Sequence, residues 1–595
     1  MAPASMTRLV ARVRVVAVAA AVTCFVTSAA AQTSGTTRDA GQRKLDQHLQ
    51  HAVDRDGDSP VRRVIVRVKP GAHAEVRGFL QTRADKLLHV HDGIGAFTVE
   101  AKHLLALAQH PAVASISIDA PIELHQTMNT SATQEVVRNS VSVPGAWTGA
   151  RVGVAIIDSG IEPSADFAGR ITAFYDFTRG GVAAAPYDDY GHGTHVAGLI
   201  GSSGALSNGA YAGLAPAARF VVLKALDGHG GGYTSDVISA IEFATANRAA
   251  LGIDIINLSL GHAPYESATT DPLVQAVEAA VRAGIVVVAS AGNFGRNETT
   301  GIIGYGGIAS PGNAPSALTV GSFMTQDTVR RSDDRMNGFS SRGPSYYDAY
   351  AKPDIVAPGY KLISNAAKQS FLYQSYPTLR AFGTNDWDYL TLSGTSMAAA
   401  VATGVVTQLL DANRAVNSSQ PLSPNAVKAI LQHTAVRLHD DTGVEYDSLT
   451  QGAGGLNGAG AIGIAHAINN AAAAGAVWLD SAQAPSTASS VVGAETVVWG
   501  TTVVWGTTAV RGNTINVKQP AWANTVVWGT GIAWANTVVW GTDVVWGDTV
   551  VWGTTVVWGT SVLEGNTVVW GNNNLTGGTS SNAVLWGNTL INPVP

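Results

Sequence analysis

The sequence predicts an α/β protein whose main domain is a doubly wound parallel sheet, preceded by a small α+β unit and followed by a β-rich repeat. Three observations predict this organisation of the 595 residues. Unbroken apolar runs alternate with helical stretches at 145–470, shorter strand and helix patterns alternate at 62–125, and a short motif recurs at 491–595. Apolar runs separated by helices are typical of strands that crossover helices bury on both faces.

The segment 1–31 has the pattern of a secretory signal peptide. Arginines precede an apolar run from Val15 to Val26, and Ser28-Ala29-Ala30-Ala31 supplies small residues before a cut ahead of Gln32. A membrane anchor is the alternative, but a span needs about 20 apolar residues and this run is shorter. The only cysteine, Cys24, lies in the run, so we expect a secreted mature protein without disulfides.

The next part of the chain is expected to hold a variable segment at 32–61 and a small unit at 62–125. In the small unit we expect strands at 64–68, 95–99 and 113–118, with helices at 76–88 and 101–109. By periodicity alone this β-α-β-α-β pattern fits any compact α+β module.

The domain at 145–470 is expected to place reactive groups along one edge of its sheet. We expect strands at 152–157, 220–226, 253–258 and 285–290, and helices at 192–199, 235–250 and 272–283. In such sheets ligands bind at the carboxyl ends of the strands. Asp158 directly follows the first of these strands and Asn293 closely follows the last, so both are expected near the site.

The end of the chain has an abrupt change of composition. After a linker at 471–490, Val-Val-Trp-Gly occurs eight times, and the tryptophans from Trp528 to Trp558 recur with a period of six. An even period returns the same side chains to the same faces of an extended chain, which suits stacked β-turns or a β-solenoid. The alternative is a β-prone low-complexity stalk without a unique fold. Rows of exposed tryptophan would also suit contact with a polysaccharide or a cell surface.

Charge and metal-ligand patterns exclude some classes of partner. Charged residues make up 13% of the chain and the net charge is −6, so nothing predicts a nucleic-acid partner. No loop has EF-hand spacing, so we assign no metal ligands and expect no required cofactor. Carboxylates such as Asp333 and Asp334 are expected to be solvated surface charges, with structural calcium as the alternative.

Three short segments supply an acid, a base and a hydroxyl: Asp158-Ser159-Gly160, Gly191-His192-Gly193-Thr194-His195 and Gly394-Thr395-Ser396-Met397-Ala398. A serine hydroxyl is a weak nucleophile, and it needs an imidazole to take its proton and a carboxylate to hold the imidazole tautomer. Ser396 is expected in the first turn of an alanine-rich helix, where backbone amides favour a developing oxyanion. His195 is expected to pack in the core.

These segments resemble the three signature blocks of the subtilisin-like serine proteases, and their order Asp, His, Ser is that of subtilisin. The resemblance covers about residues 145–470, and it implies a subtilisin-like fold and a secreted serine endopeptidase working through an acyl-enzyme intermediate. An α/β-hydrolase esterase would require Gly-x-Ser-x-Gly and a different order of residues. Further blocks agree with the resemblance: Gly213-Leu214-Ala215-Pro216, Asn257-Leu258-Ser259-Leu260-Gly261, Phe339-Ser340-Ser341-Arg342-Gly343-Pro344 and Lys352-Pro353-Asp354.

The resemblance also implies roles for single residues. Ser396 would attack the scissile carbonyl, His192 would accept and return the proton, and Asp158 would orient His192. Asn293 matches the asparagine that binds the oxyanion. Two segments would bind substrate: Ser259, Leu260 and Gly261 as one wall of the pocket for the residue before the cut, and Gly230, Gly231 and Gly232 as the edge that pairs with the substrate backbone.

The resemblance further implies that residues 62–125 form a ferredoxin-like inhibitory propeptide. Such a segment assists folding and then blocks the active site, so the chain would be a zymogen that cleaves itself, here between about Glu123 and Ser140. Its own propeptide and polypeptide substrates are therefore the expected partners.

Two departures and one alternative function bear on this prediction. Ala399-Ala400-Val401 replaces the usual Ser-Pro-His, which we expect to affect geometry rather than chemistry. Phe294 stands where an acidic residue would favour basic side chains, so we expect apolar or aromatic residues before the cut. The alternative is a surface adhesin with a vestigial protease domain, against which the intact set of Asp158, His192, Asn293 and Ser396 argues.

Overall fold

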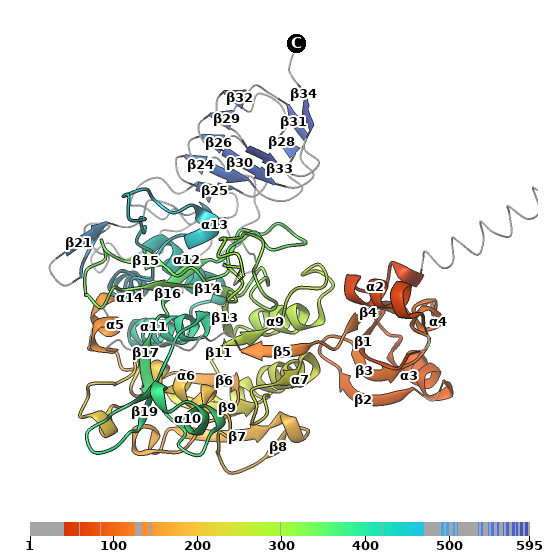
Figure 1. The fold of residues 1–595 in the computed structure, drawn as a ribbon, viewed down its shortest axis with the longest axis horizontal. Helices are drawn as coiled ribbons and strands as arrows, with labels where there is room; N and C mark the ends of the chain where they lie inside the picture. The colour runs from red at the N-terminus through yellow and green to blue at the C-terminus, as the bar shows by residue number, and fades with distance from the viewer. Residues whose placement is uncertain are drawn as a thin grey trace, which may run out of the picture. The chain divides into compact units, whose positions relative to one another are not determined.

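The computed structural model describes residues 41–468 apart from gaps at 59, 84, 125–133, 142–144, 298 and 419–420, residues 489–498 apart from 493–494, and short strands beyond 503. The chain divides into two compact units, Met1–Asp119 and Ala120–Pro595 (Figure 1). The predicted signal peptide and residues 471–488 of the predicted linker lie outside the described residues. No helix in the described part of the chain has the length and hydropathy to cross a membrane.

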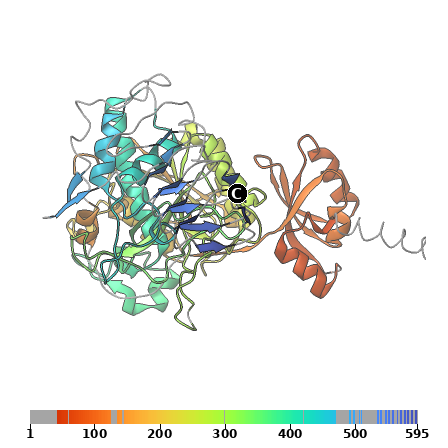
Figure 2. The ribbon, with the colours of Figure 1, turned by 90° about the horizontal axis from the view of Figure 1, so that it is seen from above.

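The first unit is an antiparallel sheet covered by helices on one face, drawn in red and orange in Figure 2. The strands follow the order β2-β3-β1-β4, and one apolar cluster takes side chains from all three helices and from β1, β3 and β4. The succession β-α-β-β-α-β from β1 onward is that of the ferredoxin-like fold. The elements are α2 (Gln47–Asp56), β1 (Arg62–Val68), α3 (His73–Thr82), β2 (Lys86–His91), β3 (Ala96–Ala101), α4 (Leu104–Ala108) and β4 (Val113–Ile118).

One sequence-based expectation for this unit was wrong. The helix expected at 76–88 ends at Thr82, and Lys86–His91 form strand β2, which pairs with β3. Leu87 and Leu88 suit a helix face and a strand equally, so local periodicity could not separate the two. Within the segment 32–61, helix α2 contributes Leu49 and Val53 to the buried core.

The second unit is built on a mostly parallel sheet, as predicted. The strand order is β15-β14-β13-β11-β6-β9-β7-β8, with β16 also paired to β14, and only the edge strands β15 and β8 run antiparallel. Every residue of β6, β11 and β13 is buried. The strands are β6 (Gly153–Asp158), β7 (Ile171–Asp176), β8 (Val182–Ala183), β9 (Arg219–Lys224), β11 (Ile255–Leu258), β13 (Val286–Ser290), β14 (Leu318–Met324), β15 (Arg335–Met336) and β16 (Ile355–Pro358).

Helices cover both faces of this sheet. Helix α11 (Thr395–Val416) packs on α6 (His192–Gly201) and α14 (Gly458–Ala467) on one face, while α7 (Thr234–Ala246) packs on α9 (Pro272–Arg282) on the other (Figure 1). All of α6 is buried, so the histidine at its first position is held by core packing. The remaining helices are α5 (Gln134–Ser140), α8 (Arg248–Leu251), α12 (Pro424–Thr434) and α13 (Ser448–Gln451).

The segment 366–388 separates two paired strands ahead of α11. It follows β17 (Leu362–Asn365), contains α10 (Phe371–Ser375) and β18 (Arg380–Ala381), and leads into β19 (Tyr389–Leu392). The side chain of Ser370 caps α10 by accepting from the Tyr373 N–H. We refer to it below as the 366–388 segment.

The first residues of the predicted repeat pack on the α/β domain. Strands β20 (Ser489–Val492) and β21 (Glu495–Val498) form a hairpin, and Val492 and Val497 are buried with Val436. The Glu495 carboxylate accepts hydrogen bonds from the backbone N–H of Arg331 at 2.7 Å and of Ser332 at 3.2 Å. The hairpin is therefore attached both by apolar packing and by polar contacts.

The later repeats form stacks of short parallel strands. Thr537 pairs with Thr549, and Thr549 pairs in turn with Thr567. Both intervals are multiples of the repeat period, so the period brings equivalent residues into register. The stacks are β24 (Ala533–Trp534), β26 (Val545–Trp546), β29 (Leu563–Glu564) and β32 (Thr579–Ser580); β25 (Thr537–Val539), β27 (Thr549–Val551), β30 (Thr567–Trp570) and β33 (Val584–Trp586); and β28 (Val556–Val557), β31 (Asn574–Thr576) and β34 (Leu590–Asn592).

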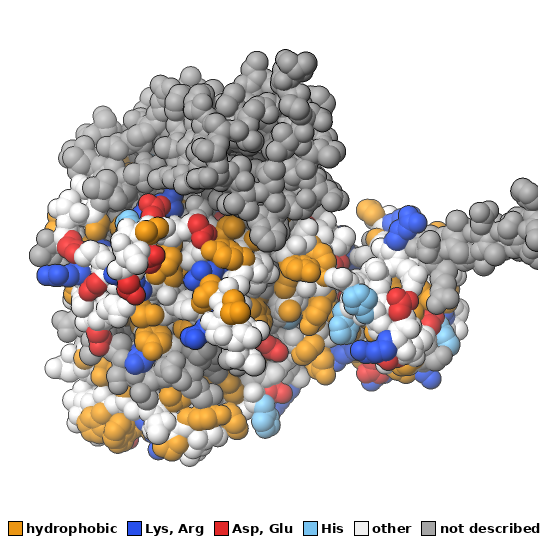
Figure 3. Space-filling view, turned by 45° about the horizontal axis from the view of Figure 1, so that its top comes forward, with side chains coloured by type: hydrophobic (Ala, Val, Ile, Leu, Met, Phe, Trp, Pro, Cys, Tyr) orange, Lys and Arg blue, Asp and Glu red, His pale blue; other side chains and the backbone are white. Residues whose placement is uncertain are grey.

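Acidic and basic side chains are interspersed on the face of the molecule that Figure 3 shows. A polyanion is bound through a patch of one sign. This face offers no such patch among its described side chains.

Candidate active site

Asp158 and His192 form a buried pair at the carboxyl edge of the sheet. Asp158 is the last residue of β6 and His192 is the first residue of α6. The Nδ1 atom of His192 lies 2.8 Å from Oδ1 and 3.0 Å from Oδ2 of Asp158. A carboxylate in this position keeps the proton on Nδ1 and leaves Nε2 as the basic nitrogen. His192 Nε2 is buried and makes no hydrogen bond to any described residue.

Ser396 lies in the first turn of α11, as predicted, and its hydroxyl bonds to the main chain. Ser396 Oγ donates to the carbonyl oxygen of Ser259 at 2.7 Å, and Ser259 Oγ donates to the carbonyl oxygen of Ser396 at 3.0 Å. The structure thus brings Ser396 together with the predicted substrate-binding residue Ser259, while the expected bond between Ser396 and His192 is not made.

Asn293 has its side-chain amide held by Thr395, the first residue of α11. Its Oδ1 accepts from the Thr395 backbone N–H at 3.1 Å and from Thr395 Oγ1 at 3.0 Å. Because the backbone N–H can only donate, these contacts fix which amide atom is oxygen. The Nδ2 atom is buried and has no hydrogen-bond partner within the described part of the chain. Such a donor beside a helix N-terminus suits an anionic oxygen.

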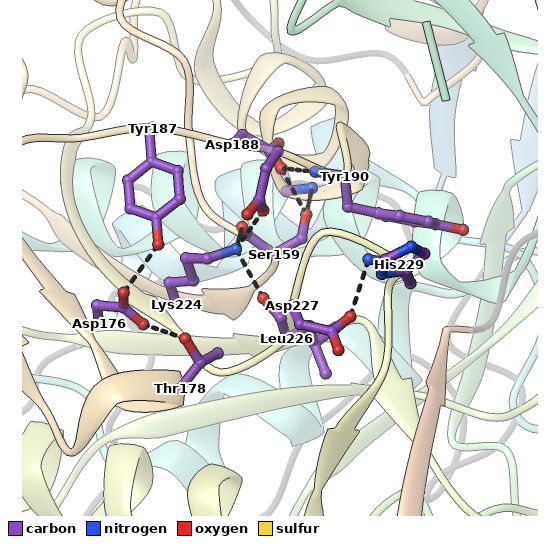
Figure 4. Close-up of polar contacts among 12 residues, drawn as sticks. Ser159, Asp176, Thr178, Tyr187, Asp188, Tyr190, Lys224, Leu226, Asp227 and His229 are labelled. Carbon is purple, nitrogen blue, oxygen red and sulfur yellow. Dashed lines mark hydrogen bonds and ion pairs between the residues drawn. The ribbon is translucent and has the colours of Figure 1, made fainter. Parts of the chain in front are cut away.

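Asp188, which the sequence reasoning missed, ties the loop after Asp158 to the start of α6. Its carboxylate accepts from Ser159 Oγ at 2.9 Å, from the Gly191 N–H at 2.7 Å and from the Thr194 N–H at 2.8 Å (Figure 4). These bonds satisfy amides at the α6 N-terminus that the helix itself leaves unpaired. An aspartate just ahead of a predicted helix is the signal that could have found it.

A buried lysine supports the same loop from the neighbouring strand. Lys224 pairs with Asp158 in the register of β9 and β6, and its side chain is almost fully buried. Its Nζ donates to the carbonyl oxygens of Ser159 and Leu226, both at 2.7 Å, and to Asp189 Oδ1 at 2.6 Å (Figure 4). The Asp188 carboxylate and the Lys224 ammonium group therefore both bond to Ser159, the residue that follows Asp158.

His195 packs in the core, as predicted. It is fully buried, its Nε2 lies 3.0 Å from the Leu362 carbonyl oxygen, and burial lowers its pKa to about 3.

The expectation that Asp334 is solvated was wrong. Asp334 is buried and lies 2.6 Å from the Arg331 guanidinium. Burial raises the pKa of Asp334 to about 7. In the described ranges, no three His, Cys, Asp or Glu side chains are grouped to hold a metal.

The predicted substrate-binding segments lie on either side of a short strand of this chain. Strand β5 (Pro121–Leu124) runs antiparallel to both β10 (Gly232–Tyr233) and β12 (Leu260–Gly261). Ile122 pairs with Gly232, and Leu124 pairs with Leu260. Along β5, Ile122 is buried, Glu123 is exposed and Leu124 is half-buried. Of the predicted substrate-binding residues, Gly232 thus pairs with β5 on one side and Leu260 and Gly261 pair with it on the other.

One edge of this doubly wound sheet presents a buried aspartate and histidine, a serine at a helix N-terminus, and an amide donor that is unpaired among the described residues. This is the arrangement of a serine peptidase. Residues 149–454 match the model of the subtilase family. The chain belongs to this family and is a serine endopeptidase.

Two curated relatives and one solved structure show the extent of the likeness. The chain is 38% identical to serine protease AprX of Bacillus subtilis (strain 168) over 339 residues, which cover 56% of this chain and 70% of that protein. It is 33% identical to subtilisin DY of Bacillus licheniformis over 296 residues, covering 49% and 87%. The crystal structure of fervidolysin from Fervidobacterium pennivorans, a keratinolytic enzyme related to subtilisin, aligns with a TM-score of 0.52 at 21% identity, covering 69% of this chain and 62% of that chain. At 21% identity this structural match supports the fold and nothing further.

Proposed function

We propose that Asp158, His192 and Ser396 are the catalytic triad of a secreted endopeptidase that is made as a self-cleaving zymogen. The observation that carries the proposal is the buried pair of His192 Nδ1 and Asp158 Oδ1 at 2.8 Å, which leaves Nε2 as an unpaired base among the described residues. The predicted signal sequence at 1–31 supports secretion.

Acylation and deacylation each use two proton transfers on His192. Ser396 Oγ leaves the Ser259 carbonyl, passes its proton to His192 Nε2 and bonds to the scissile carbonyl carbon. The imidazolium, stabilised by Asp158, gives that proton to the leaving amine as the peptide bond breaks. Water then attacks the acyl carbon and passes a proton to His192 Nε2. His192 returns that proton to Ser396 Oγ as the ester bond breaks and the new carboxyl terminus leaves.

Asn293 stabilises the tetrahedral oxygen of both steps. Its Nδ2 and the backbone N–H of Ser396 donate to the oxygen as negative charge develops there. Thr395 holds the amide of Asn293 in place beforehand, so no reorganisation is needed at the moment of attack.

A substrate binds as an added strand between residues 230–232 and 259–261. Main-chain hydrogen bonds on both sides supply affinity that does not depend on the peptide's sequence. The paired contacts of β5 with β10 and β12 support this mode of binding.

The register of β5 supports a particular bond for self-cleavage. Leu124 pairs with Leu260 and Glu123 with Gly261, so a peptide continuing in this register brings its next residue opposite Ser259. Ser259 is the residue whose carbonyl contacts Ser396 Oγ. We therefore assign the first cut to the bond between His125 and Gln126, both of which lie outside the described residues. Residues 62–125 then act as the inhibitory propeptide and folding aid.

The C-terminal repeat is proposed to form a β-solenoid that contacts a cell surface or a polysaccharide. The pairing of Thr537, Thr549 and Thr567 at multiples of the repeat period supports the solenoid. The endopeptidase mechanism requires no cofactor, and structural calcium stays a prediction.

The test is intact mass and N-terminal sequencing of the secreted wild type beside Ser396→Ala. We expect the wild type to begin at Gln126 and to react with a fluorophosphonate, and Ser396→Ala to keep its propeptide and to remain unlabelled. Processing of Ser396→Ala at the wild-type bond would contradict self-cleavage. A wild-type N-terminus upstream of Gln126 would contradict the register.

A further inference from the structure

We propose that an aromatic wall formed by Tyr190 and Phe371 makes this enzyme select substrates with an apolar side chain at the position that Leu124 occupies in β5. The inference rests on the proposed function, because it takes β5 as a guide to how a substrate lies in the groove. Tyr190 precedes the α6 N-terminus, and Phe371 belongs to the 366–388 segment.

The first step is that the Tyr190 ring lies against the loop that leads into β10. Ile122 pairs with Gly232, and Gly230 lies two residues earlier, in a turn where its N–H donates to the Asp227 carbonyl oxygen. A Cβ atom on Gly230 would lie only 2.7 Å from Cζ of the Tyr190 ring. Because β10 and β5 run antiparallel, this loop and the ring against it lie toward the Leu124 end of β5.

Leu124 packs, half-buried, against the main apolar cluster of the domain, to which Tyr190 and Leu372 belong. His229 lies in the loop that begins at Asp227 and leads to Gly230, and its backbone N–H donates to Asp227 Oδ1 at 2.8 Å (Figure 4).

The second step is that the 366–388 segment supports Tyr190 with a second ring. The rings of Tyr190 and Phe371 are nearly parallel, 9° apart, with centroids separated by 6.0 Å. The Phe371 N–H donates to the Asp189 carbonyl oxygen at 2.8 Å and the Leu372 N–H donates to that of Tyr190 at 3.0 Å. The attachment is therefore made by the main chain and survives substitution of the Phe371 side chain.

The position of Phe371 also leaves it open to a ligand. Its side chain is 39% exposed, and its ring centroid lies 6.0 Å from that of His229. Gly191 permits the close approach of the segment, because a Cβ atom there would lie 2.4 Å from Ser370 Oγ.

The consequence is selection at alternate positions of the bound peptide. An apolar side chain at the Leu124 position is removed from water against two rings. A carboxylate there would lose its water and find no donor on the ring faces, which costs more than the loss of a few methylenes. The residue at the Glu123 position is exposed and is not selected.

The test uses processed enzyme and three quenched peptides that contain Pro-Ile-Glu-Leu-His-Gln, with leucine unchanged or replaced by alanine or aspartate. For the wild type we expect kcat/KM to favour leucine over alanine by roughly tenfold and over aspartate by more. Phe371→Ala should reduce the leucine-to-alanine ratio to about threefold or less. Phe382→Ala is the matched control, since Phe382 lies in the same segment, is 49% exposed and contacts Trp387. It should keep the wild-type ratio.

Equal kcat/KM for the three peptides in the wild type would overturn the inference. A full wild-type ratio in Phe371→Ala would overturn the role of the 366–388 segment, and a reduced ratio in Phe382→Ala would show that the effect is not local to Tyr190. These outcomes differ from failure of the proposed function, in which no peptide is cut and the fluorophosphonate leaves Ser396 unlabelled.

Discussion

The Nδ1 atom of His192 lies 2.8 Å from Oδ1 of Asp158, and both side chains are fully buried. The carboxylate comes from the end of a central strand and the imidazole from the first turn of a buried helix. Asp188 and Lys224 bond to the loop that joins them. Isosteric substitutions within this pair therefore test chemistry while the backbone that carries it stays in place.

Asp158→Asn is expected to lower the rate of self-processing by roughly 10⁴-fold. The amide would donate to Nδ1 of His192 and so place the ring proton on Nε2, where it cannot accept from Ser396. The measurement is the rate at which purified precursor loses its propeptide, with near-ultraviolet circular dichroism to verify the fold. Wild-type processing by a folded Asp158→Asn would contradict the assigned role.

Asn293→Leu is expected to lower kcat by roughly 10²–10³-fold, the range found in subtilisin when one such donor is removed. KM should change little, because the lost hydrogen bond forms in the transition state. Peptide hydrolysis by processed enzyme measures both constants. Asn297→Ala, in the same loop, is the control: its Oδ1 accepts from the loop amides of Thr299 and Thr300. A rise in KM with kcat unchanged would instead indicate a binding role for Asn293.

Acidification below about pH 6.5 is expected to reduce the free energy of unfolding. Burial lowers the pKa of His195 to about 3 and that of His433 to about 4, whereas an unfolded histidine titrates near 6.5. Below 6.5 these two histidines bind protons in the unfolded chain and not in the folded chain, so their contribution to stability is complete above that pH. It falls towards pH 4 by up to about 1.4 kcal/mol per pH unit for each histidine. Asp334, whose pKa burial raises to about 7, binds a proton in the folded chain alone over this range and offsets the contribution of one histidine.

Denaturant unfolding in the Ser396→Ala background measures this dependence without self-digestion. His195→Gln, which keeps a donor for the Leu362 carbonyl, should reduce the slope between pH 6.5 and 4.5 by one proton. His439→Gln, at an exposed side chain, should leave the slope unchanged. An unchanged slope in His195→Gln would show that His195 is protonated in the folded state.

Removal of the β20–β21 hairpin is expected to destabilise the α/β domain. Deletion of 489–595 removes Val492 and Val497 from their contact with Val436, at about 1.5–3 kcal/mol for each buried valine. Deletion of 500–595 keeps the hairpin and its Glu495 contacts. Thermal melting in the Ser396→Ala background compares the two truncations. Equal melting temperatures would show that the hairpin does not stabilise the domain.

Particular elements show where sequence reasoning was sufficient. The runs that became β6, β9, β11 and β13 are mostly apolar on both faces, and a sheet covered on both faces buries such runs. Helix α11 and the position of Ser396 in its first turn were likewise predictable from Gly394 and the alanines that follow. Strand β2 and helix α2 were not predictable in this way. Strand β2 is stabilised by its pairing with β3, and α2 is stabilised by packing in one apolar cluster with residues far along the chain, such as Ile116.

The sequence by itself determined three features: the order of Asp158, His192 and Ser396 along the chain, the glycines around His192, and the period of the C-terminal repeat. Only the tertiary structure decided that Ser396 bonds to Ser259, that Asn293 keeps an unpaired Nδ2 among the described residues, that Asp334 is buried and that Phe371 stacks on Tyr190. The physical reason is that these four features depend on burial and on hydrogen bonds and packing between segments far apart in the sequence. No local sequence pattern encodes which distant groups meet.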